Sequence, residues 1–346
     1  MAGTFAILAP RHSLSEGTPL AQHARIIGWG KYLPERVLTN QELEKVVNTS
    51  DAWIKSRTGI LERRIAGPDE TASTMASRAC TDALKAASVE PDAVDLIIAA
   101  TCTADHIFPA CAALIQNSLG AKKAAAFDIN SACSGFIYAL ATASQFVAAG
   151  TYRTVLVVGT DVYSRILDWE DRNTCVLFGD GAGAVVLQAG DSPAGVQGFV
   201  LGNDGSGAAS LYTPGPCGIN DGRYFVKMNG QSVYEFAVSI IDEATRQAVA
   251  AAGLKLSDID LIIPHQANRH IIKTAARFLG LPLEKFYINV ERYGNTSAAS
   301  IPIALCEAVE EGRVKEGDRL VMVGFGGGLS WAAMVIEWGA ASQSDE

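Results

Sequence analysis

The stretch Pro91-Asp-Ala-Val-Asp-Leu-Ile-Ile98 has a near copy in the second half of the chain, Leu256-Ser-Asp-Ile-Asp-Leu-Ile-Ile263. Each copy follows a long helical pattern. Each also precedes the same series: a strand-length run, a turn rich in small residues, a helical pattern and two further apolar runs. Self-similarity of this kind indicates a repeated structural unit. The sequence therefore predicts a duplicated mixed α/β unit whose halves meet near residue 190 and pack on each other. Chance agreement of two α/β stretches is the alternative.

Strand-length apolar runs without polar alternation recur along the chain. Val155-Leu-Val-Val158 and the two Leu-Ile-Ile runs are typical of strands that are covered on both faces, as in α/β folds. Strands are predicted at residues 24–27, 96–100, 125–129, 155–159, 184–187, 198–202, 261–264, 287–290, 320–324 and 333–337, and helices at 70–87, 134–149, 232–252, 269–279 and 298–311. Gly150, Gly253 and Gly280 fall just past three of these helices, where a left-handed cap is needed.

Length and composition set the outer limits. The 346 residues are 49% hydrophobic and 19% charged, which suits about two domains and excludes global disorder. The net charge of -9 argues against nucleic acid as the main partner, because phosphate binding requires a basic field. No apolar run reaches about 18 residues, so no membrane span is expected. Residues 1–22 lack the pattern of a secretory signal. We expect them to form a loose extension of a cytoplasmic protein, followed by halves at 23–190 and 191–346.

The cysteines are odd in number and include no CxxC pair. They are Cys80, Cys102, Cys111, Cys133, Cys175, Cys217 and Cys306. Both a disulfide framework and a zinc site need pairing or close spacing, so the pattern argues against either. Reduced cysteines in apolar runs behave as small hydrophobic residues, which leaves the question of whether one of the seven has a chemical role.

Cys133 lies in a turn between a predicted strand and a predicted helix, in Asp128-Ile-Asn-Ser-Ala-Cys133-Ser-Gly-Phe. The partial positive charge of a helix N-terminus favours the thiolate, which is the nucleophilic form. Small neighbouring residues allow a tight turn and close approach of a substrate. The alternative is a cysteine that serves only in packing.

His265 and Asn295 stand at two further element ends. His265 follows a buried strand and a proline, and Asn295 precedes a helix. Taken singly, a hydrogen-bonded structural histidine and an ordinary helix N-cap are the simpler readings. The repeat, however, places Cys133 and Asn295 at equivalent turns and His265 at the strand end equivalent to Cys102-Thr103. All three are therefore predicted to meet in one cleft, where Cys, His and Asn serve nucleophilic acyl transfer or a condensing reaction.

Two glycine-rich segments follow or precede apolar strands. In Gly324-Phe-Gly-Gly-Gly328 the glycines allow backbone N–H groups to approach a developing oxyanion. A phosphate-binding loop is the alternative, but no GxxxxGK[ST] pattern is present. Phe178-Gly-Asp-Gly-Ala-Gly183 is interpreted as a tight structural turn before a strand.

Together these segments resemble the β-ketoacyl-acyl-carrier-protein synthase III family, the initiating condensing enzymes of type II fatty acid synthesis. The resemblance covers roughly residues 24 to 338, and His-Gln-Ala-Asn combined with Gly-Asn-Thr-Ser is very specific. It implies a thiolase-like fold, in which duplicated α/β halves form a layered αβαβα architecture, and a homodimer. The matching stretches are Asp51-Ala-Trp-Ile-Lys-Ser-Arg-Thr-Gly-Ile60, Phe127-Asp-Ile-Asn-Ser-Ala-Cys133-Ser-Gly-Phe136, Phe178-Gly-Asp-Gly-Ala-Gly-Ala184, Pro264-His-Gln-Ala-Asn268, Gly294-Asn-Thr-Ser-Ala-Ala-Ser300 and Phe325-Gly-Gly-Gly328.

The resemblance implies a two-step reaction without metal or redox cofactor, in which acyl-CoA is a substrate. Cys133 would take the acyl group as a thioester, and a low-pKa thiolate would suit this step. Malonyl-acyl carrier protein would then lose carbon dioxide, and its enolate would attack the thioester. His265 and Asn295 would donate hydrogen bonds to the malonyl thioester carbonyl. The backbone N–H groups of Cys133 and Gly327 would form the oxyanion hole.

Binding roles are implied by the same resemblance. Phe325 would guard the decarboxylation site. Phe108 would cross the dimer interface and close the partner's primer pocket, which favours acetyl or propionyl primers. The implied CoA-binding residues are Trp53 and Arg172, on either side of the adenine, with Arg57 and Asn268 along the channel.

Carrier-protein docking is where the sequence departs from the family pattern. Typical members have Arg two positions after the Asn of His-Gln-Ala-Asn, whereas Asn268-Arg269-His270 places it one position earlier. Glu235 stands where lysine is common. An acidic carrier protein is steered by positive charge, which leaves Arg269, Lys273 and Arg277 as docking candidates. An unusual carrier protein remains open, as does a malonyl-CoA acceptor like that of relatives in specialised metabolism.

Two other classes of protein are disfavoured by single residues. A non-catalytic acyl-CoA-binding paralogue has no need for a nucleophile such as Cys133. A degradative thiolase is expected to carry a second catalytic cysteine near residues 326–328, where this sequence has glycines.

Overall fold

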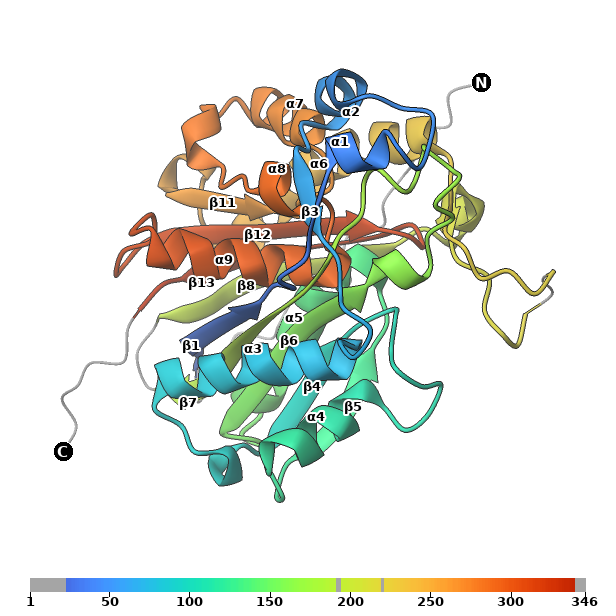
Figure 1. Ribbon diagram of the computed structural model, residues 1–346. Helices are drawn as coiled ribbons and strands as arrows, with labels where there is room; N and C mark the ends of the chain where they lie inside the picture. Colours follow the sequence, from blue (N-terminus) through green and yellow to red (C-terminus); the bar gives the residue numbers. More distant parts are fainter. Residues whose placement is uncertain (1–22, 191–193, 219–220, 340–346) are drawn as a thin grey trace.

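Two β-sheets dominate the computed structural model, which describes residues 23–190, 194–218 and 221–339 (Figure 1). The main strands are β1 (His23–Tyr32), β4 (Leu96–Ala100), β5 (Ala125–Ile129), β6 (Thr154–Val162), β7 (Asp180–Gly190), β8 (Gly195–Asn203), β11 (Leu261–Pro264), β12 (Arg319–Gly326) and β13 (Ser330–Glu337). The first sheet has the order β1-β7-β6-β4-β5, and the second has the order β11-β12-β13-β8. Two short antiparallel pairs join β2 (Val37–Thr39) to β3 (Glu62–Arg64) and β9 (Leu211–Tyr212) to β10 (Lys227–Met228).

Helices cover both faces of both sheets. They are α1 (Asn40–Leu43), α2 (Asp51–Thr58), α3 (Ala72–Ala87), α4 (Cys111–Leu119), α5 (Gly135–Ala148), α6 (Gly230–Ala251), α7 (Arg269–Leu279), α8 (Val290–Tyr293) and α9 (Ser300–Glu310). Because side chains alternate along a strand, Leu96 and Ile98 of β4 pack between the sheets while Ile97 and Ala99 pack on the outer side. α5 and α9 fill the layer between the sheets, α3 and α4 cover the first sheet, and α6 and α7 cover the second. The predicted αβαβα layering is confirmed.

The two sheets share one strand order, since β1-β7-β6-β4 corresponds to β8-β13-β12-β11. The fifth position, which β5 fills in the first sheet, has no strand in the second, so the strand predicted at 287–290 was wrong. Tyr287 N–H still donates to the carbonyl of Ile262 (2.9 Å), but Asn289 N–H donates to the side-chain oxygen of Gln266 (3.0 Å). A side-chain amide thus takes the place of a neighbouring strand, and α8 begins at the next residue.

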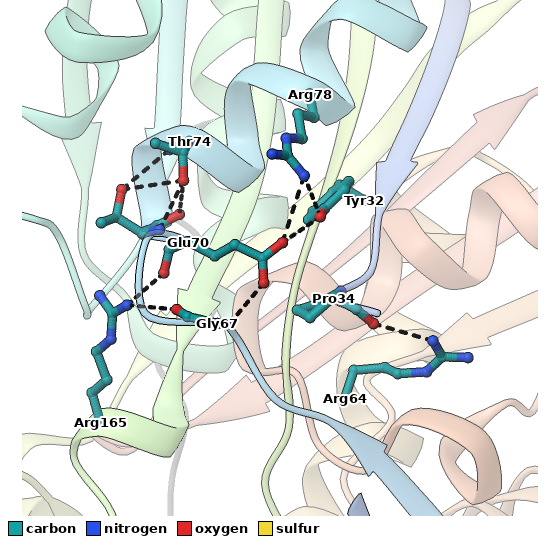
Figure 2. A network of polar contacts seen from close by, with 9 residues as sticks. Tyr32, Pro34, Arg64, Gly67, Glu70, Thr74, Arg78 and Arg165 are labelled. Carbon is teal, nitrogen blue, oxygen red and sulfur yellow. Dashed lines mark hydrogen bonds and ion pairs between the residues drawn. The ribbon is translucent and has the colours of Figure 1, made fainter. Parts of the chain in front are cut away.

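The predicted helix ends were correct to within two residues, and α7 matches its prediction at both ends. Gly150, Gly253 and Gly280 each have φ of 70°, which confirms the left-handed caps. α3 begins at Ala72 rather than at Glu70, because Glu70 turns away from the helix (Figure 2). Its carboxylate accepts from the N–H of Gly67 (2.7 Å) and also contacts the hydroxyl of Tyr32.

The segment before α3, residues 67–71, is held by hydrogen bonds from Arg165 and by the cap at the start of the helix. Arg165 donates to the carbonyl groups of Gly67 and Glu70 at 3.1 and 2.7 Å (Figure 2). It also donates to the carbonyl group of Pro68 (3.2 Å). Thr71 and Thr74 form a capping box at the start of the helix, in which each side chain satisfies an otherwise unpaired N–H. This polar network serves the fold and lies outside the cavity described below.

Four helices were not predicted: the short α1 and α8, and the longer α2 and α4. α4 has no side-chain cap from its own preceding residue. Its first N–H groups, those of Cys111 and Ala112, donate instead to the carboxylate of Asp128 on β5 (2.7 and 2.8 Å). A cap supplied by a distant residue leaves no local signal in the sequence.

The ends of the chain lie outside the described residues, and with them the predicted extension at 1–22. Among the residues that are described, no helix combines the length and apolar character needed to cross a bilayer. All seven cysteines are unpaired thiols.

Candidate active site

One cavity brings together the three residues that the sequence singled out for chemistry. It has a volume of about 680 Å³, and Cys133, His265 and Asn295 all line it. Cys133 lies in the 3-10 turn Ala132–Ser134 between β5 and α5, and His265 directly follows β11. Asn295 lies between α8 and the 3-10 turn Ser297–Ala299. Residues from both halves of the chain therefore reach one space, and two of them, Cys133 and His265, follow the ends of strands, where ligands of α/β sheets commonly bind.

The Cys133 thiol is buried and not predisposed to ionise. Only 2% of the residue is exposed, and burial raises the thiol pKa to about 12, with the nearby Asp161 carboxylate adding to the effect. A hydrogen bond from the hydroxyl of Ser297 (3.4 Å) acts in the opposite direction. The burial of Cys133 therefore argues against the predicted thiolate. The loss of hydration on burial raises the thiol pKa by more than the partial positive charge of the helix N-terminus lowers it. In addition, α5 begins two residues later, at Gly135.

Asn295 is held so that its amide nitrogen is left for the cavity. Its side-chain oxygen accepts from the N–H of Ser297 (2.8 Å). Its backbone N–H donates to Leu177 (2.8 Å), and its carbonyl accepts from Gly179 (3.0 Å). Asn295 is 7% exposed and lines the cavity. With its oxygen occupied, the remaining polar group of the side chain is a two-proton donor.

His265 is neutral and firmly placed. Burial lowers the imidazole pKa to about 3, and the residue is 1% exposed. Its Nδ1 lies 2.6 Å from the hydroxyl of Ser300, and its ring meets Phe325 edge to face at 5.1 Å between centroids. Its backbone N–H donates to Val323 on β12 (2.7 Å). As a neutral imidazole, the ring can donate one hydrogen bond and accept one, but it carries no positive charge.

The glycine-rich segment after β12 lies against the Cys133 turn. A Cβ on Gly326 would lie 2.8 Å from the Cys133 nitrogen, so glycine is required for this approach. Gly326 lines the main cavity, whereas Gly327 lines a second hollow of about 420 Å³ on the side of Ala132. The hydroxyl of Ser330 bonds to the carbonyl of Gly327 (2.9 Å), which fixes the loop.

Asp161 was missed by the sequence analysis although it organises the site. It is fully buried, and burial raises the pKa of its carboxyl. It accepts from the N–H of Cys102 (2.9 Å), from the hydroxyl of Thr103 (2.8 Å) and from the N–H of Ala298 (3.2 Å). A charged residue at the end of the apolar run 154–162 was the available signal.

Tyr163 was also missed, and it adds an aromatic wall beside the thiol. Its ring stacks on Phe178, with 4.5 Å between centroids and 12° between planes. Its hydroxyl lies 3.2 Å from the sulfur of Cys102 and 3.5 Å from the hydroxyl of Ser297. Tyr163 therefore contacts the same serine that bonds to Cys133.

The residues expected to bind CoA gather at the mouth of the cavity. Trp53, Arg57 and Asn268 line it. The guanidinium of Arg172 lies over the ring of Trp53 at 5.1 Å, so a planar base can enter between them only if Arg172 moves. Asn268 also has structural duties: it caps α7 through the N–H of His270 (2.8 Å) and donates to the carbonyl of Arg57 (3.0 Å).

The docking candidates separate into two groups. Lys273 and Arg277 line an open hollow of about 610 Å³ on α7, beside Tyr234. Arg269 instead forms an ion pair with Glu291, which takes up part of its charge. Of the three predicted docking residues, Lys273 and Arg277 therefore have more positive charge available to a partner than Arg269 has.

The two phenylalanines differ in their surroundings. Phe325 is 2% exposed and lines the cavity beside His265. Phe108 is 84% exposed and lies outside that cavity. Its neighbour Ile107 is 75% exposed, so this loop presents a large apolar surface to its surroundings.

Comparison with known proteins agrees with this geometry. The chain matches the family described as 3-oxoacyl-[acyl-carrier-protein (ACP)] synthase III over residues 127–205, and the family's C-terminal part over residues 249–338. It is 52% identical over 322 residues to the β-ketoacyl-[acyl-carrier-protein] synthase III of Symbiobacterium thermophilum, covering 91% of this chain and 98% of the relative.

Solved structures give the same result. The 3-oxoacyl-[acyl-carrier-protein] synthase III from Aquifex aeolicus VF5 is 47% identical with a TM-score of 0.87, covering 91% of this chain and 100% of the other. The β-ketoacyl-[acyl carrier protein] synthase III from Thermus thermophilus is 48% identical with a TM-score of 0.88, covering 92% and 100%.

A five-layered duplicated fold whose cavity opens on a cysteine at the head of a central helix is that of the thiolase-fold condensing acyltransferases. Within this class, identity of about half the residues over nearly the whole length decides the assignment. The chain belongs to the β-ketoacyl-acyl-carrier-protein synthase III family.

Proposed function

We propose that this chain condenses a short acyl-CoA with malonyl-acyl carrier protein, releasing carbon dioxide and forming a β-ketoacyl-acyl carrier protein. This is the reaction that initiates type II fatty acid synthesis. The observation that carries the proposal is the meeting of Cys133, His265 and Asn295 in one cavity of a chain that is 52% identical to a relative named for this activity. Acyl-CoA is a substrate, and the reaction requires no metal or redox cofactor.

The first step transfers the acyl group to Cys133. Its sulfur attacks the thioester carbonyl, the bond to the CoA sulfur breaks, and the thiol proton ends on CoA. Because the thiol pKa is about 12, we propose that the proton leaves during the attack rather than before it. The backbone N–H groups of Cys133 and Gly327 stabilise the oxyanion. The close approach of Gly326 to the Cys133 nitrogen supports this role for the glycine segment.

The second step breaks the bond between the malonyl carboxylate and its α-carbon. Carbon dioxide leaves, and the electron pair forms an enolate that attacks the Cys133 thioester. The bond to the Cys133 sulfur breaks, and the sulfur takes up a proton from solvent to regenerate the thiol. His265 and Asn295 donate hydrogen bonds to the enolate oxygen as its charge develops. A neutral His265 and an Asn295 whose own oxygen is occupied suit donation. Phe325, packed against the His265 ring, shields this position.

Substrate binding is proposed at the cavity mouth and on α7. Trp53, Arg57, Arg172 and Asn268 bind CoA, with Arg172 moving off Trp53 to admit the adenine. Lys273 and Arg277 receive the acidic carrier protein, and Arg269 contributes less because of its ion pair with Glu291. These basic residues stand out in a chain with a net charge of -9.

We also propose that the protein is a cytoplasmic homodimer of two-part subunits, with halves at 23–190 and 191–346. The exposed Phe108 and the open edge of β5 support the dimer, since a sheet edge left without a partner invites pairing. Phe108 then closes the partner's primer pocket and restricts it to acetyl or propionyl groups. Seven unpaired thiols suit a reducing compartment.

Mass spectrometry after mixing with acyl-CoAs of graded length tests the proposal. Short acyl groups should add to Cys133 and not to Cys133→Ser. Parallel addition of malonyl-acyl carrier protein and malonyl-CoA identifies the acceptor, and product from malonyl-CoA alone would favour the specialised-metabolism alternative. Failure of every acyl-CoA to label Cys133 would overturn the proposed function.

A further inference from the structure

A buried serine that was not among the predicted site residues, Ser300, contacts His265. Ser300, the first residue of α9, is 1% exposed, as is His265. Its hydroxyl oxygen lies 2.6 Å from Nδ1 of His265. The same oxygen accepts a longer hydrogen bond from the N–H of Gln266 (3.4 Å). The hydroxyl therefore lies between Nδ1 of His265, which donates or accepts depending on the tautomer, and the N–H of Gln266, which can only donate.

These contacts select one tautomer of the ring. A hydroxyl has one proton to donate and two lone pairs. If Nδ1 carried the proton, the Ser300 oxygen would accept from both Nδ1 and Gln266, and its own proton would need another acceptor. In the described parts of the chain, the acceptor that Ser300 meets is Nδ1 of His265. A buried donor without an acceptor is costly, so the serine donates and Nδ1 accepts.

We propose that Ser300 is a positioning residue that holds His265 in the tautomer with its proton on Nε2. Nε2 is then the ring nitrogen left to face the substrate, and it can only donate. This inference rests on the proposed function, because the donated hydrogen bond matters where the malonyl thioester becomes an enolate. There the breaking carbon–carbon bond leaves its electron pair on the enolate, whose oxygen accepts from Nε2 and from the amide of Asn295.

The neutrality of His265 supports the tautomer assignment. A protonated ring would carry protons on both nitrogens and would need no selection. Burial keeps the ring neutral by lowering its pKa to about 3, so the choice between Nδ1 and Nε2 arises throughout the neutral range. Edge-to-face packing on Phe325 and the bond from His265 N–H to Val323 fix the ring and backbone, which leaves the proton position to Ser300.

The steps of the reaction separate this role from a merely structural one. Acylation of Cys133 does not use the Nε2 proton, whereas malonyl decarboxylation does. Ser300→Ala should lower kcat for condensation by about 10- to 100-fold, less than loss of a direct donor. Its rate of Cys133 acylation and its KM for malonyl-acyl carrier protein should change little. Ser300→Thr, which keeps the hydroxyl, should restore most of the rate.

A matched control comes from another buried serine. Ser77 is 8% exposed, and its hydroxyl bonds within α3 to Ser73 (2.8 Å). Ser77→Ala removes a similar buried hydroxyl far from the cavity and should leave both half-reactions unchanged. A general effect of losing a buried hydroxyl would appear in both variants.

Nitrogen-15 NMR of histidine-labelled protein reads the tautomer directly, with the His265 signals identified by their loss in His265→Gln. The wild-type protein should show a proton-bearing Nε2 and a bare Nδ1, and Ser300→Ala should show a mixture. A proton on Nδ1 in the wild type would overturn the proposal, even if Ser300→Ala failed to fold. Unchanged condensation with an unchanged tautomer in Ser300→Ala would also overturn it. The proposed function fails separately, when the wild-type protein itself makes no acyl-Cys133 or no β-ketoacyl product.

Discussion

The two turns that build the cavity occupy equivalent places in the two halves and do different work. Each has a residue in the left-handed region, Ala132 with φ of 44° and Ser297 with φ of 51°. Each leads into one of the two helices between the sheets, α5 or α9. The first turn supplies the thiol of Cys133, and the second follows Asn295 and its hydrogen-bond donor. A duplicated backbone thus supports two unlike chemical groups.

The anchoring of the turns shows why neither half can form the site alone. The second turn is held by Asp161 of the first sheet, which accepts from the N–H of Ala298 (3.2 Å). The first turn is held by Ser330 of the second sheet, whose hydroxyl lies 2.8 Å from that of Ser134 and 3.2 Å from the carbonyl oxygen of Ser131. Each turn depends on a side chain from the other half, so the packing of the halves and the geometry of the site are coupled.

The largest expected effect tests the division of labour between the turns. Asn295→Ala should reduce condensation by about 10²- to 10³-fold, the usual loss for one oxyanion donor. Acylation of Cys133 should persist. Asn130→Ala is the matched control, because Asn130 holds the equivalent place and its side chain accepts from Ala132 N–H (3.4 Å) but is exposed. Rapid-quench measurement of the two half-reactions checks this, and equal losses in both variants would contradict the division.

The next effect concerns stability and compares the two cross-anchors. Asp161→Asn replaces an acceptor with a donor that faces the N–H and hydroxyl groups of a buried cluster. The free energy of unfolding should fall by about 3 kcal/mol. Ser330→Ala removes a hydroxyl rather than a charge, and about 1 kcal/mol is expected. Urea unfolding of both variants measures the difference, and a larger loss for Ser330→Ala would reverse the ranking.

A pH effect of intermediate size follows from the burial of His265. Its folded pKa of about 3 lies below the unfolded value of about 6.5. The stability gained by keeping the ring neutral is therefore fully present above about pH 6.5 and is lost as pH falls toward 3. Below about pH 6.5 the wild type should lose up to about 1.4 kcal/mol of unfolding free energy per pH unit relative to His265→Gln. Urea unfolding at several pH values, with His270→Gln as a second histidine replacement, checks this. Parallel curves for wild type and His265→Gln would count against a buried neutral ring.

What could be predicted from the sequence was set by apolar periodicity. The repeat and the uninterrupted Leu-Ile-Ile runs led to two covered sheets, because burial on both faces dominates every other signal in such strands. The failures share another cause. The start of α4 is capped by Asp128, and the strand expected at 287–290 is displaced by the side chain of Gln266. Both depend on polar contacts between residues distant in sequence.

In the site, too, the positions of the residues could be predicted from the sequence, whereas effects of residues distant in sequence could not. The meeting of Cys133, His265 and Asn295 was expected because the repeat related their positions. The ionisation of Cys133 was not, since its local position at a helix end suggested a thiolate. Burial and the distant Asp161 carboxylate raise the thiol pKa instead. Local sequence therefore singled out Cys133, while the electrostatics of its thiol depended on the fold.

The smallest expected effect sharpens that last point. Ser297 is the contact through which the second turn lowers the pKa of the Cys133 thiol, by a hydrogen bond of 3.4 Å to the sulfur. Ser297→Ala should raise that pKa further, by less than about one unit, since such a bond contributes about 1 kcal/mol or less. Alkylation of Cys133 by iodoacetamide, followed on its peptide by mass spectrometry, should slow about threefold at a fixed pH. In the wild type the rate should keep rising between about pH 7 and 9, because the thiol remains mostly protonated there. A plateau near pH 7 would mean that the terminus of α5 controls the thiol after all, and the two turns would then be electrostatically independent.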